Sequence, residues 1–310
     1  MKIIFLLINI VGFSFVSFAG TWKQRGGLIK PSGEIKKKNW LDLADSHKQS
    51  IKEIINVIET SKAGLKLIAK ARLKARMEDK SLLDVIQVGD VSITDTTLVR
   101  RFSPSRPGEI KYSTKSVVYI DRSLSAKNAV LDLSHELTHY VYKKPFNPYK
   151  EDFELSVFMY DTIEAEGGEV DAFLKECEIA LDIFGKSMLS GQCQEVFNGE
   201  GFSRAKSVEE FYKLGLHYNE FVEKSDKLKL NTSRLPISSR NSTLISSAWG
   251  VPYPLSVIEE FESIMGKVCR NDKKRLTYFD SNKGRFPASA PSRITKLYND
   301  YHRRCKNFTE

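Results

Sequence analysis

The chain has 310 residues, enough for one large or two ordinary domains with a sizeable core. Its content of 41% hydrophobic and 28% charged residues is typical of a soluble globular protein and excludes a chain without a packed core. The 48 basic residues against 39 acidic ones give a formal charge of +9, and most of this excess is dispersed. This pattern predicts weak contact with anionic envelope polymers and argues against a nucleic-acid groove.

Residues 1–19 have the pattern of an export signal. Lys2 precedes an almost unbroken apolar run that extends to Phe18. Ser17 and Ala19 place small residues at the two positions that a signal peptidase reads, which predicts cleavage after Ala19. An uncleaved anchor is the alternative, although the run is short for a spanning helix. We therefore expect a secreted or periplasmic protein with no stable membrane insertion after signal cleavage.

The remaining chain predicts an α+β fold that is mainly helical, with a small sheet. A Gly- and Lys-bearing lead-in at 20–39 comes first. Alternating apolar residues predict strands at 88–98 and 110–121, separated by a proline-containing loop at 102–108. Apolar residues at helical spacing predict helices within 40–80 (two, with a break near Gly64), 123–144, 152–183, 208–222, 255–269 and 292–305.

The four cysteines agree with export. None lies in a Cys-x-x-Cys pair, and an oxidising compartment favours two disulfides with three connectivities. Local pairing of Cys177 with Cys193 and of Cys269 with Cys305 is preferred, because each bond closes a short excursion between helices. Buried free thiols are the alternative.

The predicted helix at 123–144 is apolar nearly all round, which predicts a buried element. It carries the sequence His-Glu-x-x-His. His135 and His139 lie one turn apart on a shared face, so two imidazoles can converge on one ion. Glu136 points about 100° further round the helix, where it can act on water rather than bind the ion. A catalytic Zn2+ site is therefore predicted, and a satisfied core histidine pair is the alternative.

A catalytic zinc needs a third protein ligand and one open position. The metzincin pattern is excluded, because Tyr142 and Pro145 occupy the positions of its Gly and His. The carboxylates of the next helix are the other source of a ligand: Asp161, Glu164, Glu166, Glu169 and Asp171.

The segment at 117–174 resembles the gluzincin metallopeptidases, in which His-Glu-x-x-His is followed by a Glu on a downstream helix. The string that begins at Glu169 is also similar to the Glu-x-Asn-x-Phe stretch of ImmA/IrrE-type peptidases. The resemblance implies that His135, His139 and Glu169 bind zinc and that Glu136 is the general base. Glu164 and Glu166 remain alternatives to Glu169 as the third ligand.

The resemblance also implies a zincin-like core at 101–190 with an edge strand beside the metal helix. An N-terminal helical region at 20–100 would precede this core. A mainly helical region at 191–310 would follow and could form one domain with it. The strand just before the metal helix is expected at the edge of a cleft, where an extended peptide can add.

Supporting roles are less determined by the sequence. Gly167 and Gly168 are costly inside a helix, so they indicate either close helix packing or a helix break. Asp171 is a candidate for orienting an imidazole, or an exposed charge. The candidates for stabilising an oxyanion are unranked: Tyr142, His217 and Tyr218.

The predicted function is that of a secreted or periplasmic zinc metallopeptidase acting on a peptide or protein. One alternative is a non-catalytic protein that binds the cell envelope. Another is a zinc hydrolase of a non-peptide or cell-wall amide. Three glycosylation sequons matter only if the host glycosylates: Asn231, Asn241 and Asn307.

Overall fold

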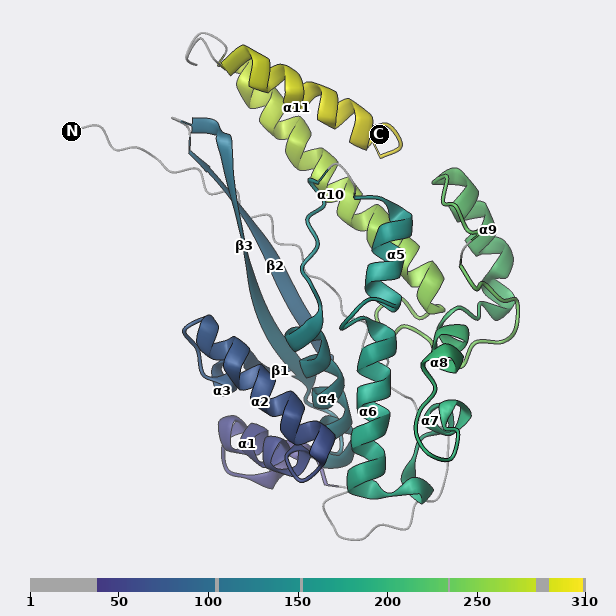
Figure 1. Ribbon diagram of the computed structural model, residues 1–310. Helices are drawn as coiled ribbons and strands as arrows, with labels where there is room; N and C mark the ends of the chain where they lie inside the picture. The colour runs from purple at the N-terminus through teal and green to yellow at the C-terminus, as the bar shows by residue number, and fades with distance from the viewer. Residues whose placement is uncertain (1–37, 104–105, 151–152, 234, 283–289, 309–310) are drawn as a thin grey trace, which may run out of the picture.

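The structure is a computed structural model that describes residues 38–103, 106–150, 153–233, 235–282 and 290–308 (Figure 1). The predicted export signal lies outside the described residues, as does nearly all of the predicted lead-in. Helices dominate these residues, and the strands among them form a single three-stranded sheet. The predicted α+β, mainly helical class is therefore confirmed.

The first half of the chain forms the N-terminal helices, the sheet and the helix that carries both histidines. Its elements are η2 Trp40–Leu43, α1 His47–Ile58, α2 Lys62–Met77, α3 Leu82–Val85, β1 Ile86–Gly89, β2 Ile93–Ser103, β3 Arg106–Asp121 and α4 Ala126–Tyr142. The second half is helical in its described part. Its elements are α5 Leu155–Ile163, α6 Glu169–Phe184, η3 Lys186–Met188, α7 Gly191–Val196, α8 Arg204–Phe211, η4 Gly215–His217, α9 Tyr218–Lys227, α10 Tyr253–Ser281 and α11 Ala290–Cys305.

The sheet has the order β1-β3-β2, so the strand before α4 is central. β3 pairs in parallel with β1 and antiparallel with β2. The expectation that this strand lies at the cleft edge was wrong, because the short β1 covers its other side. An edge strand does lie beside α4, and it is β2. Hairpin pairing also shortens the predicted loop at 102–108, since β2 and β3 extend into it.

Three helix predictions needed correction. The long helix expected at 152–183 is two helices, because Gly167 has a φ of +75°, which right-handed helices do not accommodate. The helix expected at 208–222 is likewise interrupted between α8 and α9. The break expected near Gly64 lies at 59–61, where Ser61 caps α2 by accepting from the Gly64 N–H.

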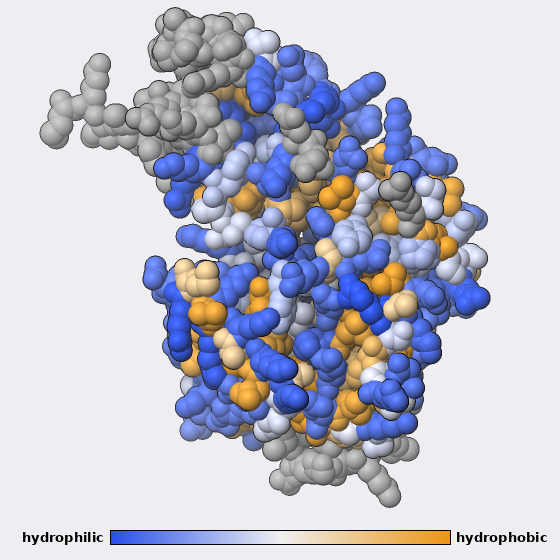
Figure 2. Space-filling view, in the orientation of Figure 1, coloured by the Kyte–Doolittle hydropathy of each residue, from blue (hydrophilic) through white to orange (hydrophobic). Residues whose placement is uncertain are grey.

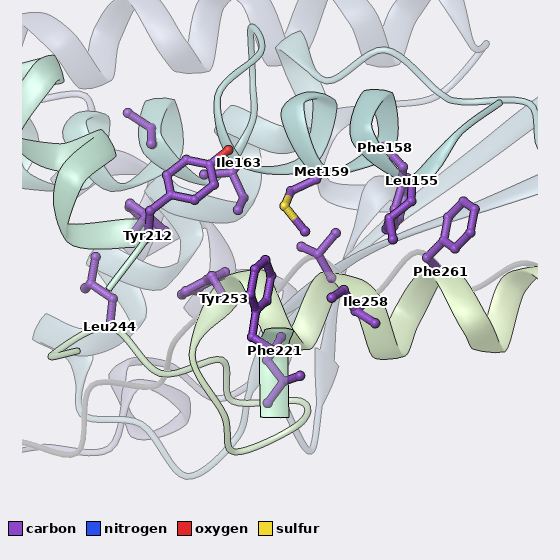
Figure 3. Packing of buried hydrophobic residues seen from close by; sticks show 14 of the residues in the cluster. Leu155, Phe158, Met159, Ile163, Tyr212, Phe221, Leu244, Tyr253, Ile258 and Phe261 are labelled. Carbon is purple, nitrogen blue, oxygen red and sulfur yellow. The ribbon is translucent and has the colours of Figure 1, made fainter. Parts of the chain in front are cut away.

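Two hydrophobic cores flank α4, which lies between the N-terminal helices and α6 (Figure 1). One core packs α1, α2 and the sheet against Val130, Leu133 and Leu137 of α4. The other packs α5, α6 and α10 together, and Figure 3 shows Met159 of α5 facing Ile258 of α10. Every residue at 132–140 is buried as a result. The sequence prediction of a buried histidine helix is confirmed.

Both predicted disulfides are present. Cys177–Cys193 joins α6 to α7, and Cys269–Cys305 joins α10 to α11. Two disulfides are compatible with an oxidising compartment. In the part of the chain that the structure describes, no helix combines the length and the apolar character needed to cross a bilayer.

A buried ion network fastens the edge strand β2 to the C-terminal helix pair. Arg100 of β2 donates from Nη1 to Asp272 Oδ1 at 3.1 Å, and Arg304 of α11 donates from Nη1 to Oδ2 at 2.8 Å. The Arg100 guanidinium also lies 3.9 Å from the ring centroid of Tyr149. The Asp272 carboxylate is fully buried, so it compensates two cations away from water.

We predict that Asp272→Ala lowers the free energy of unfolding by about 3–5 kcal/mol, because two guanidinium groups lose their buried counter-charge. Denaturant titration of the disulfide-intact protein measures this loss. Asp300→Ala is the matched control, since the Asp300–Arg303 pair is more exposed and its loss costs about 1 kcal/mol or less. Equal losses in the two variants would contradict the assignment.

Candidate metal centre

Two helices bring the three predicted ligand side chains together. His135 and His139 project from consecutive turns of α4, and Glu169 is the first residue of α6. His135 Nε2 lies 3.5 Å from Glu169 Oε2, and His139 Nε2 lies 3.5 Å from Glu169 Oε1. The break before α6 makes this possible, because it turns the start of the helix toward α4.

The chemistry of these atoms fits a bound cation. His135 Nε2, His139 Nε2 and both carboxylate oxygens of Glu169 are buried and have no hydrogen-bond partner. Leaving buried polar atoms unpaired is costly unless an ion satisfies them. Ligand atoms at 2.0–2.1 Å from a tetrahedral zinc ion lie about 3.4 Å apart, which is close to the observed separations. These three residues could therefore hold a metal ion.

Glu136 belongs to the same buried group. Ligand atoms of His135, Glu136 and His139 all lie within 4.8 Å of one another, so this set could also hold an ion. However, Glu136 Oε2 accepts from the Thr94 hydroxyl at 2.8 Å, and only its Oε1 is unpartnered. We therefore favour Glu169 as the ligand, because both of its oxygens are free to face a cation.

Each imidazole is oriented through its other ring nitrogen. His135 Nδ1 lies 3.2 Å from Glu176 Oε2, and His139 Nδ1 lies 2.8 Å from the Gly167 carbonyl oxygen. Such contacts fix the tautomer and aim Nε2 at the ion. Sequence reasoning did not identify Glu176, although its position two helical turns after Glu169 could have indicated it. Nothing in the sequence could have indicated a backbone carbonyl.

The glycine pair both breaks the helix and permits a close approach. A Cβ on Gly167 would lie 2.3 Å from the Lys143 backbone nitrogen at the end of α4. Asp171 Oδ2 accepts from the Gly167 N–H at 2.9 Å, and Arg204 pairs with the same carboxylate. Asp171 therefore supports the Gly167 turn and forms no hydrogen bond to His135 or His139 in the described structure.

The remaining predicted residues lie elsewhere. Glu164 accepts from the Tyr212 hydroxyl at 2.8 Å, and Glu166 is exposed. Asp161 is also exposed. His217 lies 3.2 Å from Glu220 on the surface. Of the two tyrosines considered for the oxyanion, Tyr142 stacks under Lys70 and Tyr218 is 38% exposed.

Tyr253 is a site residue that the sequence did not reveal. It is buried at the start of α10, and burial together with the carboxylates of Glu169 and Glu136 raises its pKa well above the ordinary value. Its hydroxyl therefore remains a hydrogen-bond donor beside the centre. It comes from a distant helix, so residue spacing carries no signal for it.

Burial and the interactions among the site residues shift their pKa values in different directions. Burial lowers the pKa of His139 to about 3, which keeps this imidazole neutral. Burial also lowers the pKa of His135, but Glu169 and Glu176 outweigh it and hold that pKa well above the ordinary value. Burial raises the pKa of Glu136 to about 8. Burial also acts to raise the pKa of Glu169, but the neighbouring histidines, of which His135 is the charged one, outweigh it and hold this pKa below its ordinary value.

No protein-family model, curated protein or solved structure matches the chain. The protein is therefore classified from its fold and from the geometry of its site. It is a mainly helical α+β protein with a buried His-Glu-His group that could hold a metal ion.

We predict that Gly167→Ala weakens zinc affinity by about 10- to 100-fold, because the new methyl group displaces the carbonyl that orients His139. Competition with a chromophoric chelator measures this affinity. Gly185→Ala is the control: Gly185 also has a positive φ, of +81°, but an added Cβ meets nothing within 4 Å. If both variants bind zinc like the native protein, the Gly167 carbonyl does not position the site.

Proposed function

We propose that this protein is a zinc-dependent metallopeptidase of the gluzincin type, secreted or periplasmic, in which His135, His139 and Glu169 hold the ion. One observation carries the proposal: four buried ligand atoms without hydrogen bonds converge from two helices. Two imidazoles and one carboxylate are a common ligand set of catalytic zinc. The disulfides support an oxidising location.

Zinc, when bound, acidifies water and polarises a carbonyl group. Glu136 has the properties of the accompanying base. Thr94 donates to its Oε2, which leaves the unpartnered Oε1 to take a proton from the attacking water. One carboxylate oxygen of Glu136 lies within 4.8 Å of a ring nitrogen of each histidine. Burial raises the pKa of Glu136, which suits its protonated form to pass the proton on to the leaving amine.

A peptide fits the surroundings of the centre. β2 pairs only with β3 among the described strands, and its residue Thr94 contacts Glu136. A strand with one unpaired side can receive an extended peptide through backbone hydrogen bonds. Tyr253 supplies a protonated hydroxyl beside the carboxylates. These features support peptide hydrolysis over a solely structural use of the histidines.

We predict that the dialysed protein retains about one zinc ion per chain and that Glu169→Ala loses it, because a third ligand is removed. Metal analysis by mass spectrometry measures the ratio. Glu166→Ala is the matched control: this exposed carboxylate is three residues away and its loss leaves zinc content unchanged. A native protein free of zinc would favour the envelope-binding alternative.

We predict that Glu136→Gln keeps zinc and lowers kcat by about 10²- to 10⁴-fold, because the amide cannot accept the proton. His139→Ala should lose both zinc and activity. Cleavage of casein and of a peptide library measures turnover, and digestion of purified cell wall runs in parallel. Undiminished peptide cleavage by the Glu136 variant would refute the base assignment, and cleavage of cell wall alone would favour the amide-hydrolase alternative.

A further inference from the structure

We propose that the substrate is an acidic peptide whose carboxylate side chain, next to the scissile bond, binds between Lys143 and Lys144. The inference rests on the proposed peptidase function and names its substrate class. It comes from a cavity that opens beside the metal centre, formed by α2, the β2–β3 hairpin and the chain that leaves α4. Figure 2 shows a notch between α2 and the hairpin, with hydrophilic residues on the hairpin side and a mixed border on the other.

The cavity adjoins the reacting groups. It is partly open to solvent, and His139 and Thr94 both line it. Because Thr94 holds Glu136 and His139 belongs to the ligand set, a side chain in this cavity would neighbour the bond under attack. A residue flanking the scissile bond is the part of a substrate that can reach this space.

The charge of the lining is strongly positive. Lys74, Lys143 and Lys144 line the cavity together with a single acidic residue, Glu78. Lys74 is already committed, since its Nζ donates to the Tyr140 carbonyl and lies over the Tyr140 ring.

Lys143 and Lys144 have different surroundings from Lys74. Neither forms an ion pair within the residues that the structure describes. Both act on Asp161 of α5, and Lys143 also acts on the buried carboxyl groups of Glu169 and Glu260, but none of these three groups lines the cavity. Both lysines therefore line the cavity without an ion pair, among the described residues, that would exclude a substrate anion.

The walls combine apolar side chains, from Tyr140, Pro145 and Phe146, with hydroxyl groups that can contact a carboxylate. Four hydroxyl side chains line them, from Thr94, Thr96, Thr114 and Ser116. Thr96 and Ser116 lie 2.9 Å apart across the hairpin, so one of these hydroxyls donates to the other and only the second can donate to an anion. The Thr94 hydroxyl already donates to Glu136, which leaves Thr114 as the other hydroxyl donor. Hydroxyl and ammonium donors together match the acceptor oxygens of Asp or Glu.

The test uses zinc-loaded protein and matched peptides that differ only by Glu or Gln at one position, scanned on both sides of the cleaved bond. We expect one position at which kcat/KM is about five- to tenfold higher for Glu, the effect of a solvent-screened ion pair. The Lys143→Gln, Lys144→Gln double variant should bring this ratio near one. Lys66→Gln, which removes an exposed charge of α2 outside the cavity, should leave it unchanged.

A second measurement does not depend on folding of the variants. Raising the salt concentration should reduce the Glu preference of the native protein, because screening weakens an exposed ion pair. The inference would be overturned if the native protein cleaved the Glu and Gln peptides with equal kcat/KM at every scanned position. So would a preference that survives unchanged in the double variant.

Separate measurements distinguish failure of the peptidase proposal from failure of the acidic-substrate proposal. Zinc content and cleavage of the neutral Gln peptides test that proposal alone. If the zinc-loaded protein cleaves no peptide, fluorescence anisotropy compares binding of labelled Glu and Gln peptides to it. Tighter binding of the Glu peptide that is lost in the double variant supports the acidic site, and equal binding refutes it.

Discussion

The geometry of the centre depends on the contact between the Gly167 turn and the end of α4. This contact places the Gly167 carbonyl on His139 and, two residues later, the Glu169 carboxylate between both imidazoles. It needs a residue with positive φ and no Cβ, and glycine meets both conditions. Starting α6 with Glu169 also places a negative charge at the positive end of the helix dipole.

The rest of the fold holds the two sides of this contact rigid. The core formed with α1 and α2 fixes one face of α4, while the core formed with α5 and α10 fixes α6. β2 connects the centre to the distant helix pair through two of its residues. Thr94 contacts Glu136 at the centre, and Arg100 contacts Asp272 of α10. Cys269–Cys305 keeps the two helices of that pair together. A site on rigid elements keeps its side chains in place.

Local pattern was sufficient for part of this structure. The histidine helix, its burial and both disulfides follow from spacing within one element or between neighbouring helices. The position of Glu169 against the imidazoles was also anticipated, although only resemblance favoured it over Glu164 and Glu166.

Long-range pairing explains what the sequence did not reveal. The place of β3 in the sheet depends on which strand pairs with its second side, and single-strand patterns do not encode that choice. The same holds for Thr94 and Tyr253, which reach the centre from other elements. The Gly167–Gly168 pair was ambiguous for a related reason: helix packing and helix breaking both use glycine, and only the tertiary contact distinguishes them.

Two neighbouring carboxylates can perform different tasks because their surroundings differ. The pKa of Glu169 stays below its ordinary value despite burial, and each of its oxygens lies 3.5 Å from an imidazole nitrogen, which suits a ligand. Glu136 is raised in pKa by burial and tied at one oxygen to Thr94, which suits a group that accepts and returns a proton. In the proposed mechanism, the carboxylate that faces both imidazoles is the ligand and the other carboxylate is the base. The turn at Gly167 determines that Glu169 is the one that faces both imidazoles.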